Sequence, residues 1–129
     1  TTNKMTTKHL EAKGEVDYDY KEDTLFFKIK NREYAKSIDF EDMVLDVDKE
    51  GFITGIQIFD VSKLFKLQKE ALRNVKYTQF NTKVKKNVIT VQFMFNCVLR
   101  NKQIVERGEN MIRESPSPLL EREVECIVA

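Results

Sequence analysis

Residues 46–57 read DVDKEGFITGIQ, and this stretch decides whether the chain carries a calcium-binding loop or a β-hairpin. A twelve-residue EF-hand loop has acidic residues at positions 1, 3 and 5, a glycine at position 6 and a bidentate glutamate at position 12. The first four requirements are met by Asp46, Asp48, Glu50 and Gly51. The twelfth residue is Gln57, whose neutral amide cannot offer calcium two carboxylate oxygens. The flanking residues must therefore decide.

Both flanks of this stretch have the alternation of β-strands. Apolar residues recur at every second position over 43–48 and again over 52–59, which is the period of a strand and not of a helix. The four residues between them, 48–51, have turn chemistry, and Gly51 suits the left-handed position of a bulged hairpin. The sequence predicts a β-hairpin here. Weak metal binding by the carboxylates of residues 46–51 remains an alternative.

Outside the hairpin, period-two alternation predicts further strands on both sides of a helix. In the first half it covers residues 15–20, 24–30 and 33–39, and in the second half it covers 75–99, with a turn near Lys86 and Asn87, and then 102–114 and 119–129. Residues 60–73 instead have helical periodicity, with Asp60 as the N-cap and Asn74 at the end. We predict an α+β fold of mostly antiparallel β meanders with one amphipathic helix.

The domain organisation follows from where the regular pattern begins. Residues 1–14 have no sustained period, which predicts a loose N-terminal tail. Residues 15–129 have the length of a single domain, in which residues 75–129 form the second β region, and the whole chain has a hydrophobic content of 41%.

Composition narrows the class of protein further. No apolar run approaches the roughly 20 residues that span a bilayer, and the chain does not open with a signal peptide, so we expect a soluble cytoplasmic protein without membrane contact. Cys97 and Cys126 share no C-x-x-C spacing and alternate with apolar residues, which predicts two buried thiols. Abundant Lys and Glu with few Pro and Gly are typical of a thermophile.

A basic segment is the candidate binding site for nucleic acid. Residues 63–86 hold eight Lys or Arg against one Glu, although the whole chain has a net charge of only +1. Clustered cations bind phosphates, and aromatic residues such as Tyr77 and Phe80 can stack on bases. The candidate contacts are Lys63, Lys66, Lys69, Arg73, Lys76, Tyr77, Lys83, Lys85 and Lys86. The alternative interpretation is a solvated face whose lysines cover apolar surface.

Catalytic and cofactor-binding patterns are missing from the sequence. The single histidine, His9, falls in the predicted tail, which argues against Ser-His or Cys-His catalysis, and the four glycines are isolated, so no phosphate-binding loop is indicated. We therefore expect a protein that is not an enzyme and has no cofactor.

Apolar residues on both faces of some strands, such as Phe26, Phe59 and Met94, predict a homodimer or another protein partner.

Two motifs resemble a prokaryotic family of small β-rich proteins whose domain has no known function. The first has a Tyr-Asp opening and the second has a G-I-x-I-x-D-x-S segment, and together they cover roughly residues 15–66. The residues that carry the resemblance are Tyr18, Asp19, Asp23, Leu25, Asp46, Asp48, Gly51, Gly55, Ile56, Ile58, Asp60 and Ser62. Some members of the family appear beside candidate toxins, which implies an interaction or antitoxin-like role. Residues 75–129 lie outside the family pattern.

The hypothesis that follows from the whole sequence is an uncharacterised self-associating or protein-interaction module, with a nucleic-acid-binding module as the alternative.

Overall fold

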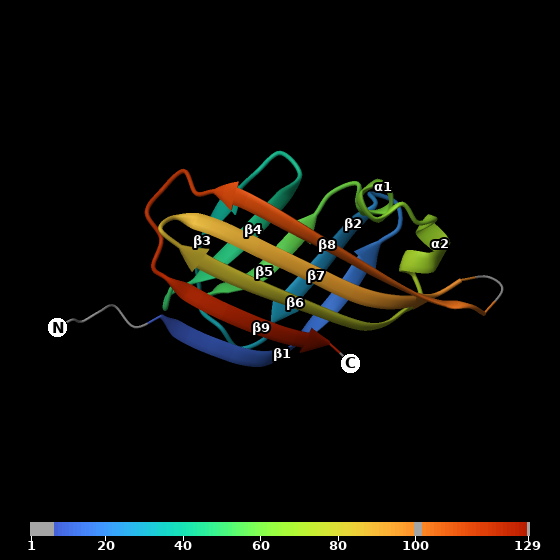
Figure 1. The fold of residues 1–129 in the computed structure, drawn as a ribbon, viewed down its shortest axis with the longest axis horizontal. Coiled ribbons are helices and arrows are strands. Elements are labelled where there is room, and N and C mark those ends of the chain that lie inside the picture. Colours follow the sequence, from blue (N-terminus) through green and yellow to red (C-terminus); the bar gives the residue numbers. More distant parts are fainter. Residues whose placement is uncertain (1–6, 100–101, 129) are drawn as a thin grey trace.

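A computed structural model describes residues 7–99 and 102–128, and within them nine strands form one mixed sheet in the order β3-β4-β5-β2-β1-β9-β6-β7-β8 (Figure 1). The strands are β1 (Lys8–Asp19), β2 (Thr24–Ile29), β3 (Tyr34–Asp39), β4 (Met43–Asp48), β5 (Ile53–Ile58), β6 (Val75–Lys85), β7 (Val88–Val98), β8 (Ile104–Glu114) and β9 (Arg122–Val128). Two short helices, α1 (Val61–Phe65) and α2 (Lys69–Leu72), join β5 to β6.

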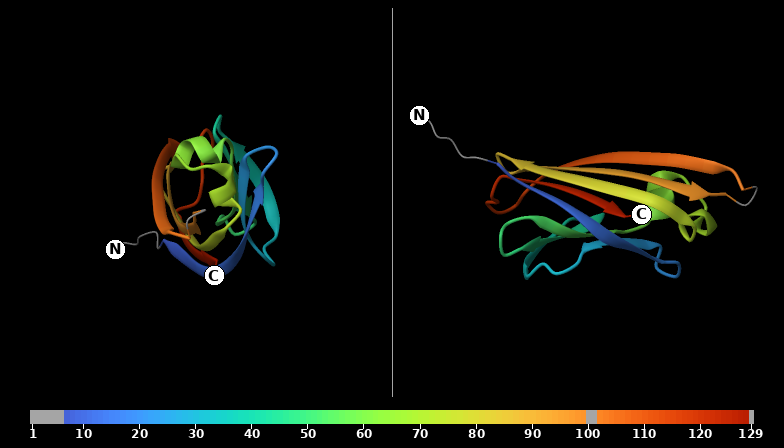
Figure 2. Two further views of the ribbon diagram at one scale, coloured as in Figure 1. Left: turned by 90° about the vertical axis from the view of Figure 1, so that its right-hand side faces the viewer. Right: turned by 90° about the horizontal axis from the view of Figure 1, so that it is seen from below.

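The sheet curls into two facing layers because β1 belongs to both of them. Residues 8–13 of β1 pair in parallel with β9, and residues 14–19 pair antiparallel with β2. At the changeover, a Cβ on Gly14 would lie 2.8 Å from the carbonyl oxygen of Lys28, so only glycine lets the strands approach this closely. Figure 2 shows β6 to β9 in one layer and β2 to β5 in the other.

The core fills the space between the two layers. The ring of Phe27 lies 5.3 Å from that of Phe80 and 5.5 Å from that of Phe93, which joins the layers through aromatic contacts. Each such side chain contributes about 2 kcal/mol of apolar burial to stability. Cys97 and Cys126 are fully buried in this core, as the alternation predicted, and burial raises the pKa of the Cys126 thiol to about 11.

The strand predictions of both halves are confirmed. The stretch that resembled a calcium loop is the β4–β5 hairpin, and Gly51 adopts φ 89°, the left-handed conformation that its turn requires. Lys86 and Asn87 form the β6–β7 turn with φ of 50° and 62°. The segments predicted over 102–114 and 119–129 contain β8 and β9.

The single helix predicted over 60–73 is wrong. Lys66 turns into the left-handed conformation with φ 55°, which ends α1 after five residues, and α2 has only four. Asp60 is itself left-handed, and its side chain makes no capping hydrogen bond. The side-chain amide of Asn74 does donate to the carbonyl oxygen of Glu70, as expected for a residue that closes a helix.

The prediction of a mostly β fold is confirmed. The α+β label and the antiparallel meander hold only in part, because the helices are short and because β1 and β9 are parallel.

The predicted loose tail of residues 1–14 also needs correction. Residues 1–6 lie outside the described part of the chain, but β1 begins at Lys8. Leu10 and Ala12 pack against the core because residues 8–13 are held by β9, a partner more than 100 residues away in sequence. A strand that depends on so distant a neighbour has only a weak local pattern.

Of the helices that the structure describes, none has the length and apolar character to cross a membrane.

Candidate functional site

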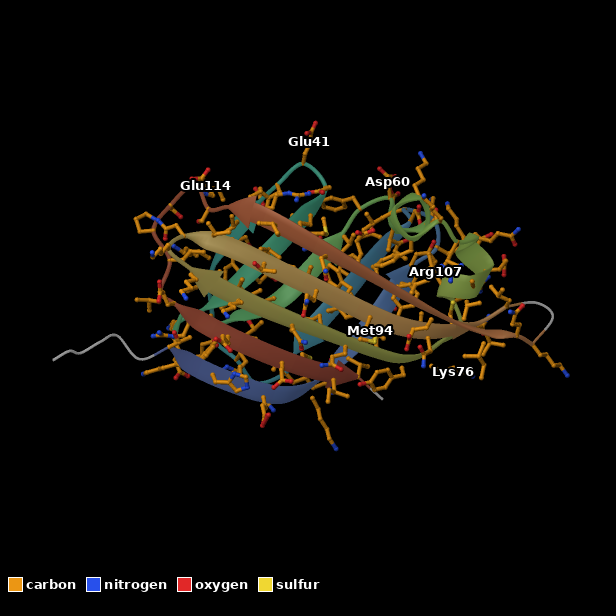
Figure 3. The ribbon with its side chains drawn as sticks, in the orientation of Figure 1. Glu41, Asp60, Lys76, Met94, Arg107 and Glu114 are labelled. Atoms are coloured by element: carbon orange, nitrogen blue, oxygen red, sulfur yellow. The ribbon has the colours of Figure 1, made fainter. Side chains whose placement is uncertain are left out.

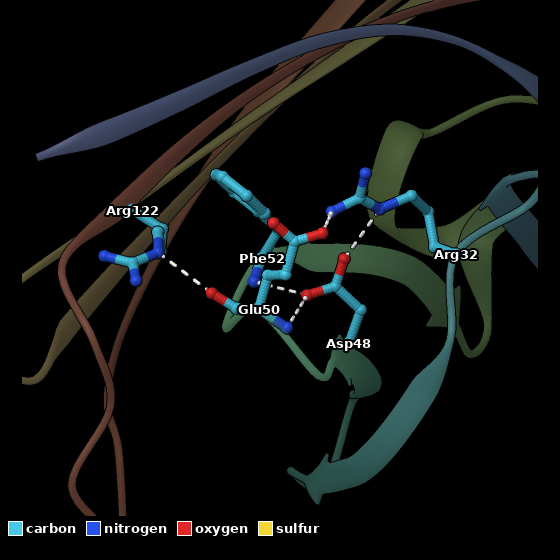
Figure 4. Close-up of polar contacts among 5 residues, drawn as sticks. All are labelled: Arg32, Asp48, Glu50, Phe52 and Arg122. Atoms are coloured by element: carbon cyan, nitrogen blue, oxygen red, sulfur yellow. Dashed lines mark hydrogen bonds and ion pairs between the residues drawn. The ribbon is translucent and has the colours of Figure 1, made fainter.

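The acidic side chains of the β4–β5 hairpin form hydrogen bonds and ion pairs with other groups of the protein (Figure 4). Asp48 is only 3% exposed and accepts hydrogen bonds from Arg32 Nε at 2.8 Å and from the backbone N–H groups of Glu50 and Phe52 at 2.9 Å. Arg32 also donates to the Glu50 carboxylate at 2.8 Å. Asp46 accepts from the hydroxyl of Ser37. These carboxylates therefore stabilise the turn, and they do not converge on one point where an ion could sit.

A second buried carboxylate, Asp23, connects the two motifs of the family resemblance. It accepts hydrogen bonds from the Tyr18 hydroxyl at 2.7 Å, from the Ser62 hydroxyl at 2.6 Å and from the Ser62 backbone N–H at 3.2 Å. Asp23 thereby caps the start of α1, the role that the sequence assigned to Asp60. Tyr18, Asp23 and Ser62 form a structural network that joins β1 and the β1–β2 turn to α1.

The ionisation of this network follows from its contacts. Burial alone would raise the pKa of Asp23, but the hydrogen bonds from Ser62 and Tyr18 outweigh it and lower that pKa. The pKa of Tyr18 is raised, first by burial and then by its hydrogen bond to Asp23. A negative Asp23 beside a neutral Tyr18 is the stable arrangement at neutral pH, as expected for a structural contact.

The basic segment is divided between the two ends of the molecule. Lys63, Lys66, Lys69 and Arg73 lie on or beside the two helices, close to Lys76 at the start of β6, whereas Lys83, Lys85 and Lys86 lie at the far end of that strand (Figure 1). Lys76 and Lys83 are seven positions apart, which corresponds to about 23 Å of extended chain. This exceeds the Debye length of about 8 Å at physiological salt, so the two groups act as separate charges.

Several members of the basic segment already have partners. Lys69 donates to the carbonyl oxygen of Tyr20, and Arg73 lies 4.9 Å above the Tyr20 ring. The hydroxyl of Tyr77 donates to Gln79 at 3.0 Å. Phe80, expected to stack on bases, is fully buried, so that expectation is wrong. Nucleic-acid binding by this segment stays a prediction, now without a continuous surface to support it.

His9 gathers carboxylates on the exposed side of β1 and β9. Its Nε2 lies 3.1 Å from Glu125 and 3.9 Å from Glu11, and its Nδ1 lies 3.7 Å from Glu123. Within the described residues, His9, Glu11 and Glu125 are the group whose potential metal ligands lie within 4.8 Å of one another. His9 and Glu11 are exposed and Glu123 and Glu125 are half-buried, and a surface hydrogen bond between the imidazole and Glu125 accounts for the closest contact.

The exposed apolar side chains are concentrated on one sheet face. We call the surface of β6 to β9 that points away from the core the outer face. Of the eight exposed large apolar residues in the described part of the chain, five lie on it: Val88, Met94, Ile104, Ile112 and Ile127. Ile104 and Ile112, both on β8, are the most exposed of the five at 68% and 63%. Figure 3 labels Met94 on this face and Arg107 and Glu114 along β8.

β8 is also an edge strand, and it differs from the edge strand at the other end of the sheet. β3 has six residues with a register irregularity near Lys36, features that discourage pairing with another chain. β8 has eleven residues in regular register with β7, its one sheet neighbour among the described residues, and it contains neither proline nor lysine. We call its outward backbone edge the β8 edge.

The β8 edge could not be identified from the sequence alone. The alternation of residues 104–114 indicated a strand, but only the order of strands in the sheet shows that β8 lies at an end of it. The available signal was the recurrence of Ile104 and Ile112 among charged neighbours, since an apolar residue on a strand face without a neighbour remains exposed.

Comparison with known proteins places the first half of the chain in a family. Residues 15–62 match the family model described as "Protein of unknown function (DUF2283)", in agreement with the resemblance over residues 15–66. The matched region contains Tyr18, Asp23, Asp48 and Ser62, so the family pattern coincides with the internal polar contacts described above.

Two archaeal relatives extend the match, in keeping with the prokaryotic expectation. A Methanosarcina mazei protein named "Putative hypoxanthine phosphoribosyltransferase" is 37% identical over 92 residues, which cover 71% of this chain and 74% of the relative. An uncharacterized protein of Methanocaldococcus jannaschii is 32% identical over 97 residues, which cover 74% of this chain and 84% of the relative. No solved structure matches the chain. By these similarities, the chain belongs to the DUF2283 family of proteins of unknown function.

Proposed function

We propose that this protein is a non-enzymatic, self-associating module and that the β8 edge, with the outer face beside it, is its interaction surface. The observation that carries the proposal is the coincidence of two features on β8. Its backbone edge is long and regular, and its two isoleucines are exposed. A strand with free N–H and C=O groups beside exposed apolar side chains is suited to pairing with another strand.

Self-association is favoured over capture of a different protein because it needs no further component. A two-fold axis brings the same strand of two copies together in antiparallel orientation and continues the sheet across the interface. Burial of Ile104 and Ile112 from both copies then removes apolar surface from water.

The experiment measures molar mass by light scattering for the wild-type chain and two variants. We expect the wild type to be a dimer and Ile112→Glu to dissociate at least about tenfold more readily, because the glutamate must be desolvated at the interface. The matched control is Tyr34→Glu, which changes a residue of similar exposure, 60%, on the opposite edge strand and should leave the dimer intact. A monomeric wild type at high concentration, or equal weakening by both variants, would contradict the proposal.

The proposal does not extend to the activity named for the Methanosarcina relative. Proteins bind phosphate groups at glycine-rich loops and at the N-termini of helices, where several backbone N–H groups converge. In the described part of this chain the helices have five and four residues, and the glycines are isolated. An assay for pyrophosphate release from phosphoribosyl pyrophosphate and hypoxanthine should show no turnover, and turnover by purified protein would refute the non-enzymatic assignment.

A further inference from the structure

We propose that two copies of this chain pair their β8 strands antiparallel with Gly108 of each copy on the two-fold axis. This register rests on the self-association proposed above and specifies which residues meet. In an antiparallel pair, residues that lie directly opposite share one face of the sheet. With Gly108 on the axis, each residue of β8 therefore meets the residue that lies equally far on the other side of Gly108 in the second copy.

Within residues 104–112, this register pairs apolar residues with apolar residues and opposite charges with each other. On the outer face, Ile104 lies opposite the partner's Ile112, and the same pair recurs by symmetry at the other end. On the inner side, Arg107 lies opposite the partner's Glu109, again twice, and Val105 lies opposite the partner's Met111. Apolar residues thus meet apolar residues and opposite charges meet each other, both of which favour cross-strand pairing.

Neighbouring registers place like charges together. With Arg107 on the axis, the two copies of Arg107 face each other, and with Glu109 on the axis the two glutamates do. With Asn110 on the axis, Arg107 meets the partner's Arg113. Like charges directly opposite destabilise a strand pair. Among the registers centred on residues 107 to 110, the alternating charges of β8 therefore favour the one with Gly108 on the axis.

The two charges that this register pairs are available in the single chain. Among the described residues, the carboxylate of Glu109 has no hydrogen bond or ion pair, and Arg107 donates only to the carbonyl oxygen of its neighbour Glu106, at 3.1 Å. Arg113 differs because it forms an ion pair with Asp42 at the tip of the β3–β4 turn. The carboxylates of Glu106 and Glu114 also have no hydrogen bond or ion pair among the described residues, but Arg107 and Glu109 are the two opposite charges that this register brings face to face.

A groove next to the β8 edge gives a second, independent reason for a covering strand. It has a volume of about 670 Å3 and lies between the end of β8, the start of α1 and the β3–β4 turn. Its lining includes three partly buried apolar side chains, Phe40, Phe59 and Leu64, and it is bordered by Arg113. A strand added to the β8 edge continues the sheet along this groove and shields its apolar lining from water.

Charge exchange tests the Arg107–Glu109 contact. Arg107→Glu and Glu109→Arg each create two like-charge contacts, and each should raise the dimer dissociation constant by about tenfold or more. The double variant restores opposite charges in exchanged positions, so its dissociation constant should return to within about threefold of the wild type. A double variant as weak as the sum of the two single changes would overturn the proposed pairing.

Cysteine cross-linking tests the position of the axis. Opposed residues in antiparallel strands have Cα atoms about 4.5 to 5.5 Å apart, within the range of a disulfide, so Gly108→Cys should form a disulfide-linked dimer on mild oxidation. The control Asn110→Cys lies on the same face, but its two copies would be about 14 Å apart and should not cross-link. The two native cysteines are fully buried and should not compete.

The combined outcomes separate the register from the self-association beneath it. A wild-type dimer in which Asn110→Cys cross-links and Gly108→Cys does not would overturn the register and leave self-association standing. A wild-type chain that stays monomeric would overturn both. If Gly108→Cys fails to fold, as judged by its circular dichroism spectrum, the charge-exchange series decides the register.

Discussion

Asp23→Ala is expected to lower the free energy of unfolding by about 4 kcal/mol. The substitution removes the acceptor for the Tyr18 hydroxyl, the Ser62 hydroxyl and the Ser62 backbone N–H, and it leaves these part-buried donors without a partner. Asp23 also adopts φ 55°, a left-handed conformation that aspartate and asparagine tolerate better than alanine. Urea denaturation measures the change.

Two further variants show whether the loss arises from these contacts. Asp23→Asn keeps the backbone preference and one acceptor oxygen, so it should lose about half as much stability as the alanine variant. Asp17→Ala removes an exposed carboxylate from the same β1–β2 region and should change stability by less than about 0.5 kcal/mol. An alanine variant at Asp23 that loses less than about 1 kcal/mol would show that the network does not hold α1 against β1.

The same carboxylate gives stability a defined dependence on pH. The folded-state pKa of Asp23 lies below its ordinary value of 3.8, so the folded protein binds this proton more weakly than the unfolded chain does. The resulting stabilisation is complete above the ordinary pKa and is lost as pH falls through the folded-state pKa. Urea denaturation between pH 5 and pH 2 should therefore show a steeper acid loss for the wild type than for Asp23→Asn.

Asp48→Ala is expected to cost about 3 kcal/mol. Asp48 is almost fully buried and accepts from two backbone N–H groups of the β4–β5 turn and from Arg32. The Arg32 guanidinium also lies 5.4 Å from the centre of the Phe52 ring, so the loss extends to the packing of the turn. Thermal unfolding monitored by circular dichroism measures the effect.

Glu50→Ala is the matched control because Glu50 binds the same arginine from an exposed position. Its carboxylate lies 2.8 Å from Arg32, but its side chain is 64% exposed, so this ion pair contributes less than about 1 kcal/mol. If both variants had equal effects, the backbone hydrogen bonds to Asp48 would not be the source of its importance.

The fold was predictable where its causes are local. Gly51 and the alternation around it specified the β4–β5 hairpin, because a turn and its flanking strands are encoded within a dozen residues. The break at Lys66 was not predictable, since the apolar stripe continues through it. The cap of α1 was also missed, because Asp23 reaches Ser62 across 39 residues of sequence. The sequence pattern predicts only the second half of β1 for the same reason, because the first half of this strand is held by pairing with β9.

The candidate site was harder to predict than the fold. The run of lysines from Lys63 to Lys86 looked continuous in sequence, but β6 carries its two halves to opposite ends of the molecule. Self-association stays a prediction, and Met94, one of the apolar residues on which it rests, is exposed on the outer face. The proposed location on β8 comes from the order of the strands, which no local pattern contains.

Hydrogen exchange of the backbone amides in β8 tests self-association through this edge most directly. In an antiparallel strand, alternate residues direct their N–H groups to opposite sides, so about half of the β8 amides point away from β7. We predict that these outward amides become protected as protein concentration rises, while the outward amides of β3 exchange rapidly throughout and serve as the internal reference. Outward β8 amides that exchange as fast as those of β3 at the highest concentration would contradict the account.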